Sequence, residues 1–449
     1  MSENIVLKQG LDVPVSGSAC LRVGKSMLPP VVAVCPGDFK GLLPRLLVKE
    51  GDRVLCGSPV IADKKNPDIL LPAPASGTVE SVVRGEKRKL LAVLIRTDDR
   101  QEYAPLSFGA LSDEASVKAA LLSSGLWPFI VQRPYGIIAD PAVTPSAIYV
   151  SAFNTAPLAA DTEFTLGTEL AAIQKGIDAL SKIAPVHVGV DASLGEGSAF
   201  LRLTGCTLHG FKGKHPAGNV GVQISHIRPI GKGDTVWTLP LFGVAAIGKS
   251  ILKGRLELRR KVAVCGPAAI EPSYAETIPG TPVSEFAAWY GNSADELRFV
   301  SGDLLSGRNA GIGGFLGWAD DQLSLIREGV EPELLGWIRP LRLAQFSTDR
   351  SYFSWLMPWR RYDMDTNLHG GKRAFLMNES YYKKVLPIDI FPVSLAKACL
   401  AGDIEKMEKF GIYEVLPCDL ATCEFVDPSK NDIQEIIAKG IDLMLKEMA

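Results

Sequence analysis

The chain has 449 residues, of which 47% are apolar and 22% charged, values that are typical of a globular protein and exclude a largely disordered one. At about 100–200 residues per domain, this length predicts roughly three domains. The 48 basic and 50 acidic residues give a net charge of −2. This balance removes the general electrostatic attraction to nucleic acid, so no nucleic-acid partner is expected.

Eight cysteines without a dense framework indicate a reducing compartment rather than a disulfide scaffold. The first ten residues lack the apolar core of a signal peptide. The longest uncharged stretch, 141–160, contains three prolines, which would break a membrane-spanning helix. We therefore expect a buried strand with loops there, and no transmembrane segment in this chain.

Residues 1–105 alternate short apolar runs with glycine and proline turns, a pattern typical of a small β-barrel. Two segments, KEGDRV (49–54) and APASGTV (73–79), resemble the signatures of the biotinyl/lipoyl-like barrel. In carriers with this barrel a lysine on the intervening hairpin is modified, and Lys64 and Lys65 lie at about that place. Their neighbours do not supply the methionine–lysine context of carriers, so solvated turn residues are the favoured interpretation and modification the alternative.

Residues 106–258 alternate helices and buried strands, which predicts a parallel, Rossmann-like α/β domain. Ser112 is the expected N-cap of a first helix that ends at Gly125. An apolar stripe predicts an amphipathic helix over 169–183, and strands are expected at 147–151 and 186–190. Neither a G-x-G-x-x-G sequence nor a P-loop is present, so no nucleotide site is predicted.

Residues 259–345 return to short strands, expected at 262–264, 299–300 and 323–326, and form a predicted β-rich module. The glycine-rich 311–314 does not lead into a clear helix, so we expect a turn rather than a phosphate site. Residues 386–449 form a predicted helical domain, with helices at 404–410 and 433–448.

The connecting segment 346–385 begins with an unusual concentration of aromatic and arginine residues. Tryptophan, tyrosine and arginine are enriched in protein interfaces, and tryptophan and tyrosine also at membrane surfaces. We expect a partner-docking surface there, with a packed satellite of the core as the alternative. Its candidate residues are Trp355, Trp359, Arg360 and Arg361.

No metal site is predicted. Cys418 and Cys423 supply two of the four thiolates that an iron–sulfur cluster needs, so ordinary thiols are the favoured interpretation. The spacing of the histidines between 209 and 226 fits no standard zinc pattern. The loop 214–218 either presents Lys214 and His215 to an anionic or quinoid ligand or is a structural turn. No catalytic triad or carboxylate dyad emerges.

Considered along its whole length, the sequence resembles the family of A subunits of sodium-translocating NADH:quinone reductases. The order of its motifs carries this resemblance: GLDVPVSG (10–17), DKKNP (63–67), PAPASG (72–77), SGLW (124–127), NTAPLAA (154–160), HPAG (215–218), VSG (300–302), LIREG (325–329), LGW (335–337) and LPID (386–389). The resemblance implies that 259–345 is an SLBB (β-grasp-like) domain.

The resemblance also implies a function. The complex oxidises NADH, reduces ubiquinone or menaquinone and exports Na⁺, while NADH, FAD, FMN and iron–sulfur centres are bound by partner subunits. This subunit would bind no cofactor of its own. It would lie peripherally on the cytoplasmic face of the bacterial inner membrane, docked on the membrane subunits, and take part in binding quinone.

More distantly, the family is similar to the C subunit of Rnf complexes and to the flavin-bearing subunit of respiratory complex I. The stretch 125–134 has lost the glycines of their flavin loop, and the C-terminal cysteine run is lost as well. A quinone needs an apolar slot with one or two hydrogen-bond donors, and the candidate residues are Phe129, Arg133, Tyr135 and His215. The alternatives are an Rnf-type flavin and iron–sulfur subunit, a carrier that uses the barrel, and a non-catalytic scaffold.

Overall fold

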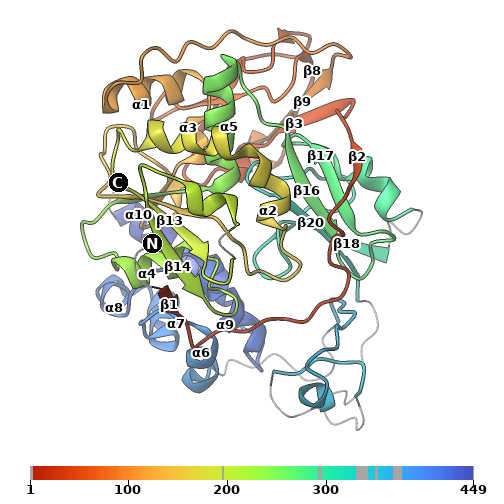
Figure 1. The fold of residues 1–449 in the computed structure, drawn as a ribbon, viewed down its shortest axis with the longest axis vertical. Coiled ribbons are helices and arrows are strands. Elements are labelled where there is room, and N and C mark those ends of the chain that lie inside the picture. Colours follow the sequence, from red (N-terminus) through yellow and green to blue (C-terminus); the bar gives the residue numbers. More distant parts are fainter. Residues whose placement is uncertain are drawn as a thin grey trace.

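The structure is a computed structural model that describes residues 4–194, 197–291, 296–329, 342–348, 352–367 and 377–447. Its described strands form sheets of seven, six, four and three strands. In Figure 1 the barrel strands lie at the top, the six-stranded sheet at the right, and the C-terminal helices at the lower left. None of the helices among these residues is long and apolar enough to cross a membrane.

The two smaller sheets form the predicted N-terminal barrel and enclose a core of small aliphatic side chains. The four-stranded sheet has the order β3 (Val31–Val34), β9 (Leu90–Thr97), β8 (Gly77–Arg84) and β5 (Arg53–Val54). The three-stranded sheet has the order β4 (Pro44–Leu46), β6 (Pro59–Asp63) and β7 (Leu70–Pro72). Position 77 requires glycine for a steric reason, because a Cβ there would lie 2.0 Å from the Arg96 carbonyl oxygen. Lys64 and Lys65 are exposed in the loop between β6 and β7, as predicted.

The first residues of the chain contribute strands to two other sheets. β1 (Asn4–Val6) pairs in parallel with β14 (Thr207–Lys212) at the edge of the seven-stranded sheet. β2 (Val23–Ser26) pairs with β17 (Ser273–Thr277) at the edge of the six-stranded sheet. The N-terminal segment therefore links three parts of the molecule before the barrel strands begin, and the domain ranges stay a prediction.

The seven-stranded sheet contains the predicted parallel strands. Its order is β1, β14, β13 (Val186–Asp191), β12 (Ile148–Ser151), β15 (Val236–Pro240), β10 (Val131–Arg133) and β11 (Ile137–Ile138). The strands from β1 to β15 in this order pair in parallel, whereas β10 pairs antiparallel with both β15 and β11. Burial of both faces explains why Ile148, Tyr149 and Val150 of β12 are all apolar.

Helices α3 (Leu170–Leu180) and α5 (Leu241–Lys253) cover one face of this sheet. They lie close together because glycines meet at the crossing: a Cβ on Gly248 would lie 1.7 Å from the Ala172 carbonyl oxygen, and one on Gly176 2.3 Å from that of Val244. α3 confirms the predicted amphipathic helix, and its Ile173, Ile177 and Leu180 are buried.

The N-cap predicted for α1 (Glu114–Ser123) is wrong by one residue. Asp113, not Ser112, caps the helix: its carboxylate accepts from the Ser116 N–H at 2.9 Å, and the Asp113 N–H donates to Ser116 Oγ. Only a side chain at position 113 reaches the third helical N–H in this way, so the reciprocal capping box decides the start. The short helices α2 (Thr162–Leu166) and α4 (Val220–Ile227) follow later in this region.

The six-stranded sheet has the order β19 (Arg308–Asn309), β18 (Leu297–Ser301), β20 (Gln322–Arg327), β16 (Arg260–Cys265), β17 and β2. β16, β18 and β20 confirm the three strands predicted for this region. Residues 312–313 form a turn, also as predicted. The first part of the connecting segment, residues 346–362, is called the aromatic segment. It contains a short 3₁₀ helix at Phe353–Leu356, and a β-bridge between Val15 and Tyr362 joins it to the N-terminal segment.

The C-terminal helices cover the opposite face of the seven-stranded sheet. They are α6 (Glu379–Val385), α7 (Pro392–Ala401), α8 (Ile404–Lys409), α9 (Ala421–Val426) and α10 (Ile433–Glu447). Tyr149 of β12 packs in one core with Leu395 and Ile437 of these helices, while the neighbouring Ile148 and Val150 pack with the helices of the other face. The predicted helices at 404–410 and 433–448 correspond to α8 and α10.

Candidate functional site

A cavity of about 380 Å³ lies at the carboxyl ends of the parallel strands β12 and β15. The chain runs from β12 to β13 and β14 on one side, and β15 then returns to the other side of β12. Such a reversal leaves a crevice between neighbouring strand ends, where open α/β sheets bind ligands. The topology therefore places this cavity at the position where a ligand site is expected.

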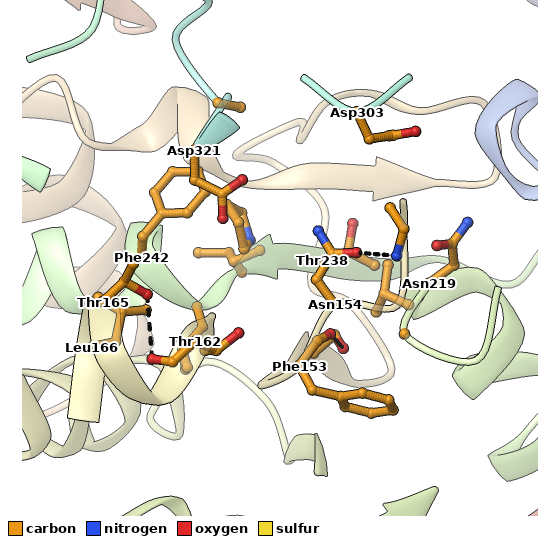
Figure 2. A pocket seen from close by; sticks show the side chains of 18 of the residues that line it. Phe153, Asn154, Thr162, Thr165, Leu166, Asn219, Thr238, Phe242, Asp303 and Asp321 are labelled. Carbon is orange, nitrogen blue, oxygen red and sulfur yellow. Dashed lines mark hydrogen bonds between the residues drawn. The ribbon is translucent and has the colours of Figure 1, made fainter. Parts of the chain in front are cut away.

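Four parts of the chain close the cavity: the seven-stranded sheet, its helices α2, α4 and α5, strand β16 with loops of the six-stranded sheet, and the 3₁₀ helix Pro417–Leu420 just before α9. Figure 2 shows the ring of Phe242 on one side, Phe153 below, and Thr238 and Asn154 between them. The apolar lining is Val131, Phe153, Ala156, Leu166, Val220, Leu239, Pro240, Leu241 and Phe242. The cavity is therefore an apolar slot with polar groups at separate places on its wall.

One polar end is built around a buried ion pair. Arg133 Nη1 donates to Asp419 Oδ2 at 2.9 Å, and the two side chains are 3% and 0% exposed. Asp419 also accepts from the Leu416 N–H at 3.0 Å and from Asn219 Nδ2 at 3.4 Å. Arg133 Nε is buried and has no hydrogen-bond partner in the described part of the chain. The pair joins the C-terminal helices to the sheet and leaves one donor of the guanidinium unsatisfied.

The other polar end belongs to the six-stranded sheet. Arg260 Nη2 donates to the carbonyl oxygens of Gly317 at 3.0 Å and Asp320 at 2.6 Å, and its guanidinium lies 4.9 Å from the centre of the Phe242 ring. Burial lowers the pKa of Arg260 to about 10, so it stays charged at neutral pH. Arg260 Nε is also buried without a hydrogen-bond partner among the described residues. Asp321 lines the same end, and burial raises its pKa to about 6.

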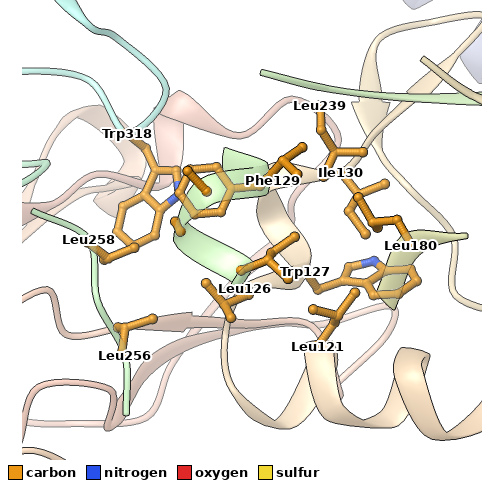
Figure 3. Packing of buried hydrophobic residues seen from close by; sticks show 14 of the residues in the cluster. Leu121, Leu126, Trp127, Phe129, Ile130, Leu180, Leu239, Leu256, Leu258 and Trp318 are labelled. Carbon is orange, nitrogen blue, oxygen red and sulfur yellow. The ribbon is translucent and has the colours of Figure 1, made fainter. Parts of the chain in front are cut away.

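The four residues predicted for a quinone site do not all meet at this cavity. Arg133 lines it. Phe129 lies behind the wall, where its ring packs against Phe242 and Trp318 in the core that Figure 3 shows. Tyr135 lies in the other core, beside Tyr413 of the C-terminal region. The role of these residues stays a prediction, with Arg133 alone of the four on the cavity wall.

His215 is buried next to the cavity rather than presented by an open loop. Its Nδ1 is 3.2 Å from Thr155 Oγ1, and its backbone N–H donates to Asp12 Oδ1 at 3.1 Å. Burial lowers its pKa. Lys214 beside it is exposed. These contacts favour a structural role for the loop 214–218, since they hold its backbone to the N-terminal segment and to the strand end that carries Asn154 and Thr155.

The cysteines of the C-terminal region are free thiols. Cys418 lines the cavity beside Asp419, and burial raises its pKa to about 12. Cys423 is buried in the helical core. Within the ranges that the structure describes, no three histidine, cysteine or acidic residues are placed to hold a metal ion.

The aromatic segment exposes large apolar side chains. The exposed fractions are 40% for Phe353, 49% for Trp355, 50% for Leu356 and 77% for Trp359. Arg361 is exposed and Arg360 half-buried, with its guanidinium 5.4 Å from the centre of the Tyr362 ring. Contiguous exposed apolar side chains of this kind are typical of an interaction surface.

Sequence reasoning missed Asp321, Arg260, Asn219 and Asp419 as parts of the site. Asp419 lies 286 residues after Arg133, and no spacing rule connects two such positions. The one available signal was the reversal of strand order, which becomes visible only when strand neighbours are known.

Comparison with known proteins identifies the family. Residues 5–98 match the NqrA N-terminal barrel-sandwich hybrid domain, residues 112–256 the NqrA second alpha/beta domain, and residues 261–311 the NQRA C-terminal domain, its SLBB module. The chain is 35% identical over 439 residues to the A subunit of the Na⁺-translocating NADH-quinone reductase of Yersinia pestis bv. Antiqua, and the match covers 96% of this chain and 97% of the relative.

The chain belongs to the NqrA family. Further relatives that carry the same name are those of Alcanivorax borkumensis, 35% identical over 97% of this chain and 98% of the relative, and of Neisseria meningitidis serogroup C, 33% identical over 99% and 100%. The NqrA matches confirm an N-terminal barrel, a second α/β domain and an SLBB domain. The cavity takes wall residues from the second and the SLBB domain, and from helices beyond the last matched residue.

Proposed function

We propose that this chain is the A subunit of a Na⁺-translocating NADH:quinone reductase and binds ubiquinone in the cavity at the ends of β12 and β15. Membership of the NqrA family supports the assignment to the complex. In this proposal NADH is oxidised and electrons are carried by flavins and iron–sulfur centres of partner subunits. This chain contributes a binding surface for the quinone and is not itself the complete catalytic site.

The observation that carries the quinone proposal is the pairing of an apolar slot with two buried, unsatisfied arginine donors. Arg133 Nε and Arg260 Nε each lack a partner among the described residues, and both side chains line the cavity. A buried donor without an acceptor costs about 1–3 kcal/mol. A quinone presents one carbonyl acceptor on each of two opposite ring edges, and an aromatic face suited to the Phe242 and Phe153 rings.

Figure 2 supports two separate polar ends. Asp321 lies with Phe242 on one side of the cavity, and Asn219, which bonds to Asp419, lies on the other, with Thr238 between. The substrate head would thus meet Arg260 at one end and Arg133 at the other. The isoprenoid tail would require an apolar exit, and the cavity is open to solvent rather than enclosed, which leaves room for it.

Binding of short-chain ubiquinone-1 to the purified full chain tests the proposal. Ala156→Leu fills part of the cavity and should lower the affinity at least tenfold, while Ala115→Leu, on the exposed side of α1, should not change it. Equilibrium dialysis measures both. Wild-type protein without saturable binding, or equal affinity of the Ala156→Leu variant, would contradict the quinone site.

We also infer that the aromatic segment docks this subunit on the membrane subunits at the cytoplasmic face. The exposed Trp355 and Trp359, with Arg360 and Arg361 beside them, have the composition of an interface centre. Trp359→Ala with Arg361→Ala should release the chain from the purified complex without changing its own unfolding. Leu252→Ala, which replaces another exposed apolar residue, on α5, is the control. Retention of the double variant at wild-type stoichiometry would refute this surface.

A further inference from the structure

Asp321 places a buried carboxyl group on the wall of the cavity. Figure 2 shows it above the cavity beside the Phe242 ring. Its backbone carbonyl accepts from the Ala263 N–H at 2.8 Å, so the residue is held rigidly against β16. Among the described residues no lysine, arginine or histidine forms an ion pair with its carboxylate. A ligand in the cavity therefore meets a fixed acid whose carboxylate forms no ion pair within the described part of the chain.

Burial raises the pKa of Asp321 to about 6, and the neighbouring charges add smaller effects of both signs. Arg260 favours the charged form, while Asp320 and Asp303 disfavour it, and burial is the largest effect. Asp320 is engaged by Ser301 Oγ at 2.5 Å, and Asp303 by its own loop.

The remaining charged groups on the neighbouring walls are already engaged. Lys261 on β16 donates to the Phe164 carbonyl oxygen at 2.9 Å, and Glu169 is paired with Lys249 at 3.2 Å. With these groups satisfied by the protein, Asp321 is the acid at this end whose protonation a ligand can change.

We propose that Asp321 distinguishes the two redox states of the bound ring. Protonated Asp321 donates a hydrogen bond to a quinone carbonyl, and ionised Asp321 accepts one from a quinol hydroxyl. This inference rests on the proposed quinone site. A quinone oxygen is only an acceptor, so an ionised carboxylate beside it would set two acceptors together. A quinol hydroxyl is a donor, and its hydrogen bond to a carboxylate is charge-assisted and correspondingly strong.

A thermodynamic consequence follows for binding. Near neutral pH, where Asp321 is largely ionised, quinone binding must take up a proton at this site, whereas quinol binding needs none. Quinone affinity should therefore fall as pH rises from about 5 to about 8, by roughly fifty- to a hundredfold, while quinol affinity holds or rises. No electron transfer is involved, since each redox form is added as such.

Calorimetry on the purified full chain tests this, with ubiquinone-1 or ubiquinol-1 titrated in two buffers of different ionisation enthalpy. The expected result is uptake of nearly one proton per quinone near pH 7 and none per quinol. Asp321→Asn always carries a donor, so its quinone affinity should be independent of pH and its proton uptake lost. Glu169→Gln, which also replaces a carboxylate on the cavity wall but not one that shifts the pKa of Asp321, should keep the wild-type pH dependence.

The outcomes separate the two proposals. Wild-type protein that binds quinone without proton uptake overturns the role of Asp321 and leaves the quinone site standing. The same holds if Asp321→Asn keeps the wild-type pH dependence. Wild-type protein that binds neither redox form at any pH overturns the quinone site itself, and this inference with it.

Discussion

Replacing Asp419 by alanine should loosen the attachment of the C-terminal helices to the seven-stranded sheet. The change leaves the guanidinium of Arg133, 3% exposed, without the carboxylate now 2.9 Å away. Removing one partner of a buried pair costs about 3–5 kcal/mol. The Leu416 N–H loses its acceptor as well, so we expect the free energy of opening the C-terminal helices to fall by about 4–5 kcal/mol.

The buried thiol of Cys423 in α9 gives a local assay for this loss. Labelling under native conditions, followed by mass spectrometry of its peptide, reports the opening of the C-terminal helices. A loss of about 4 kcal/mol in opening free energy should speed the labelling roughly a thousandfold. The matched control is Asp442→Ala, because its ion pair with Lys40 also joins these helices to another part of the chain but is exposed. That pair is worth about 0–1 kcal/mol, so the control should change labelling less than about fivefold.

A double variant checks the electrostatic explanation. Arg133→Met with Asp419→Leu removes both charges and should recover most of the protection lost in Asp419→Ala, because no unpaired charge stays buried. Equal labelling rates for the Asp419 and Asp442 variants, or a double variant as open as the single one, would refute the reasoning.

Three further outcomes are expected. Gly221→Ala should also speed the Cys423 labelling at least tenfold, because the new Cβ would lie 2.3 Å from a carboxylate oxygen of Asp419. Gly37→Ala, whose new Cβ would have no atom within 4 Å, should leave the labelling rate unchanged. Trp127→Ala should lower the free energy of unfolding by about 3–5 kcal/mol, because the ring is fully buried, and Trp359→Ala by less than about 0.5 kcal/mol, both measured in urea. The folded-state pKa of Asp321, about 6, lies above the ordinary 3.8, so its contribution to stability is present below about pH 3.8 and lost as pH rises through about 6. The wild-type free energy of unfolding should therefore fall between about pH 4 and pH 7, and in Asp321→Asn this fall should be smaller by up to about 3 kcal/mol.

The local elements followed from the sequence because short-range rules govern them. The apolar stripe of α3 requires contact with a core on one side, and the three consecutive apolar residues that begin β12 require burial on both. The start of α1 was wrong by one residue because several consecutive polar side chains compete for the cap, and the bond to Ser116 decides among them. The motif order along the chain correctly indicated the NqrA family.

The position of the cavity depended on long-range pairing. β1 and β2 are short strands with mostly exposed residues, and no periodicity marks them, yet they tie the N-terminal segment to two sheets. Arg133 was a reasonable candidate because it follows the first helix, but its partner Asp419 comes from the C-terminal helices. Phe129 lies in the short 3₁₀ helix Trp127–Phe129 before β10, and its ring packs into the core against Trp318.

The amino-acid sequence by itself determined the family and the succession of barrel, parallel sheet, β-rich module and helices, because the burial patterns and turn chemistry behind these elements act over a few residues. The tertiary structure alone decided which charged groups share a wall: Arg133 with Asp419, and Arg260 with Asp321. The physical reason is that burial, which raises the pKa of Asp321 and makes the Arg133 pair costly to break, is a property of all the segments packed around a group and not of its neighbours in the chain.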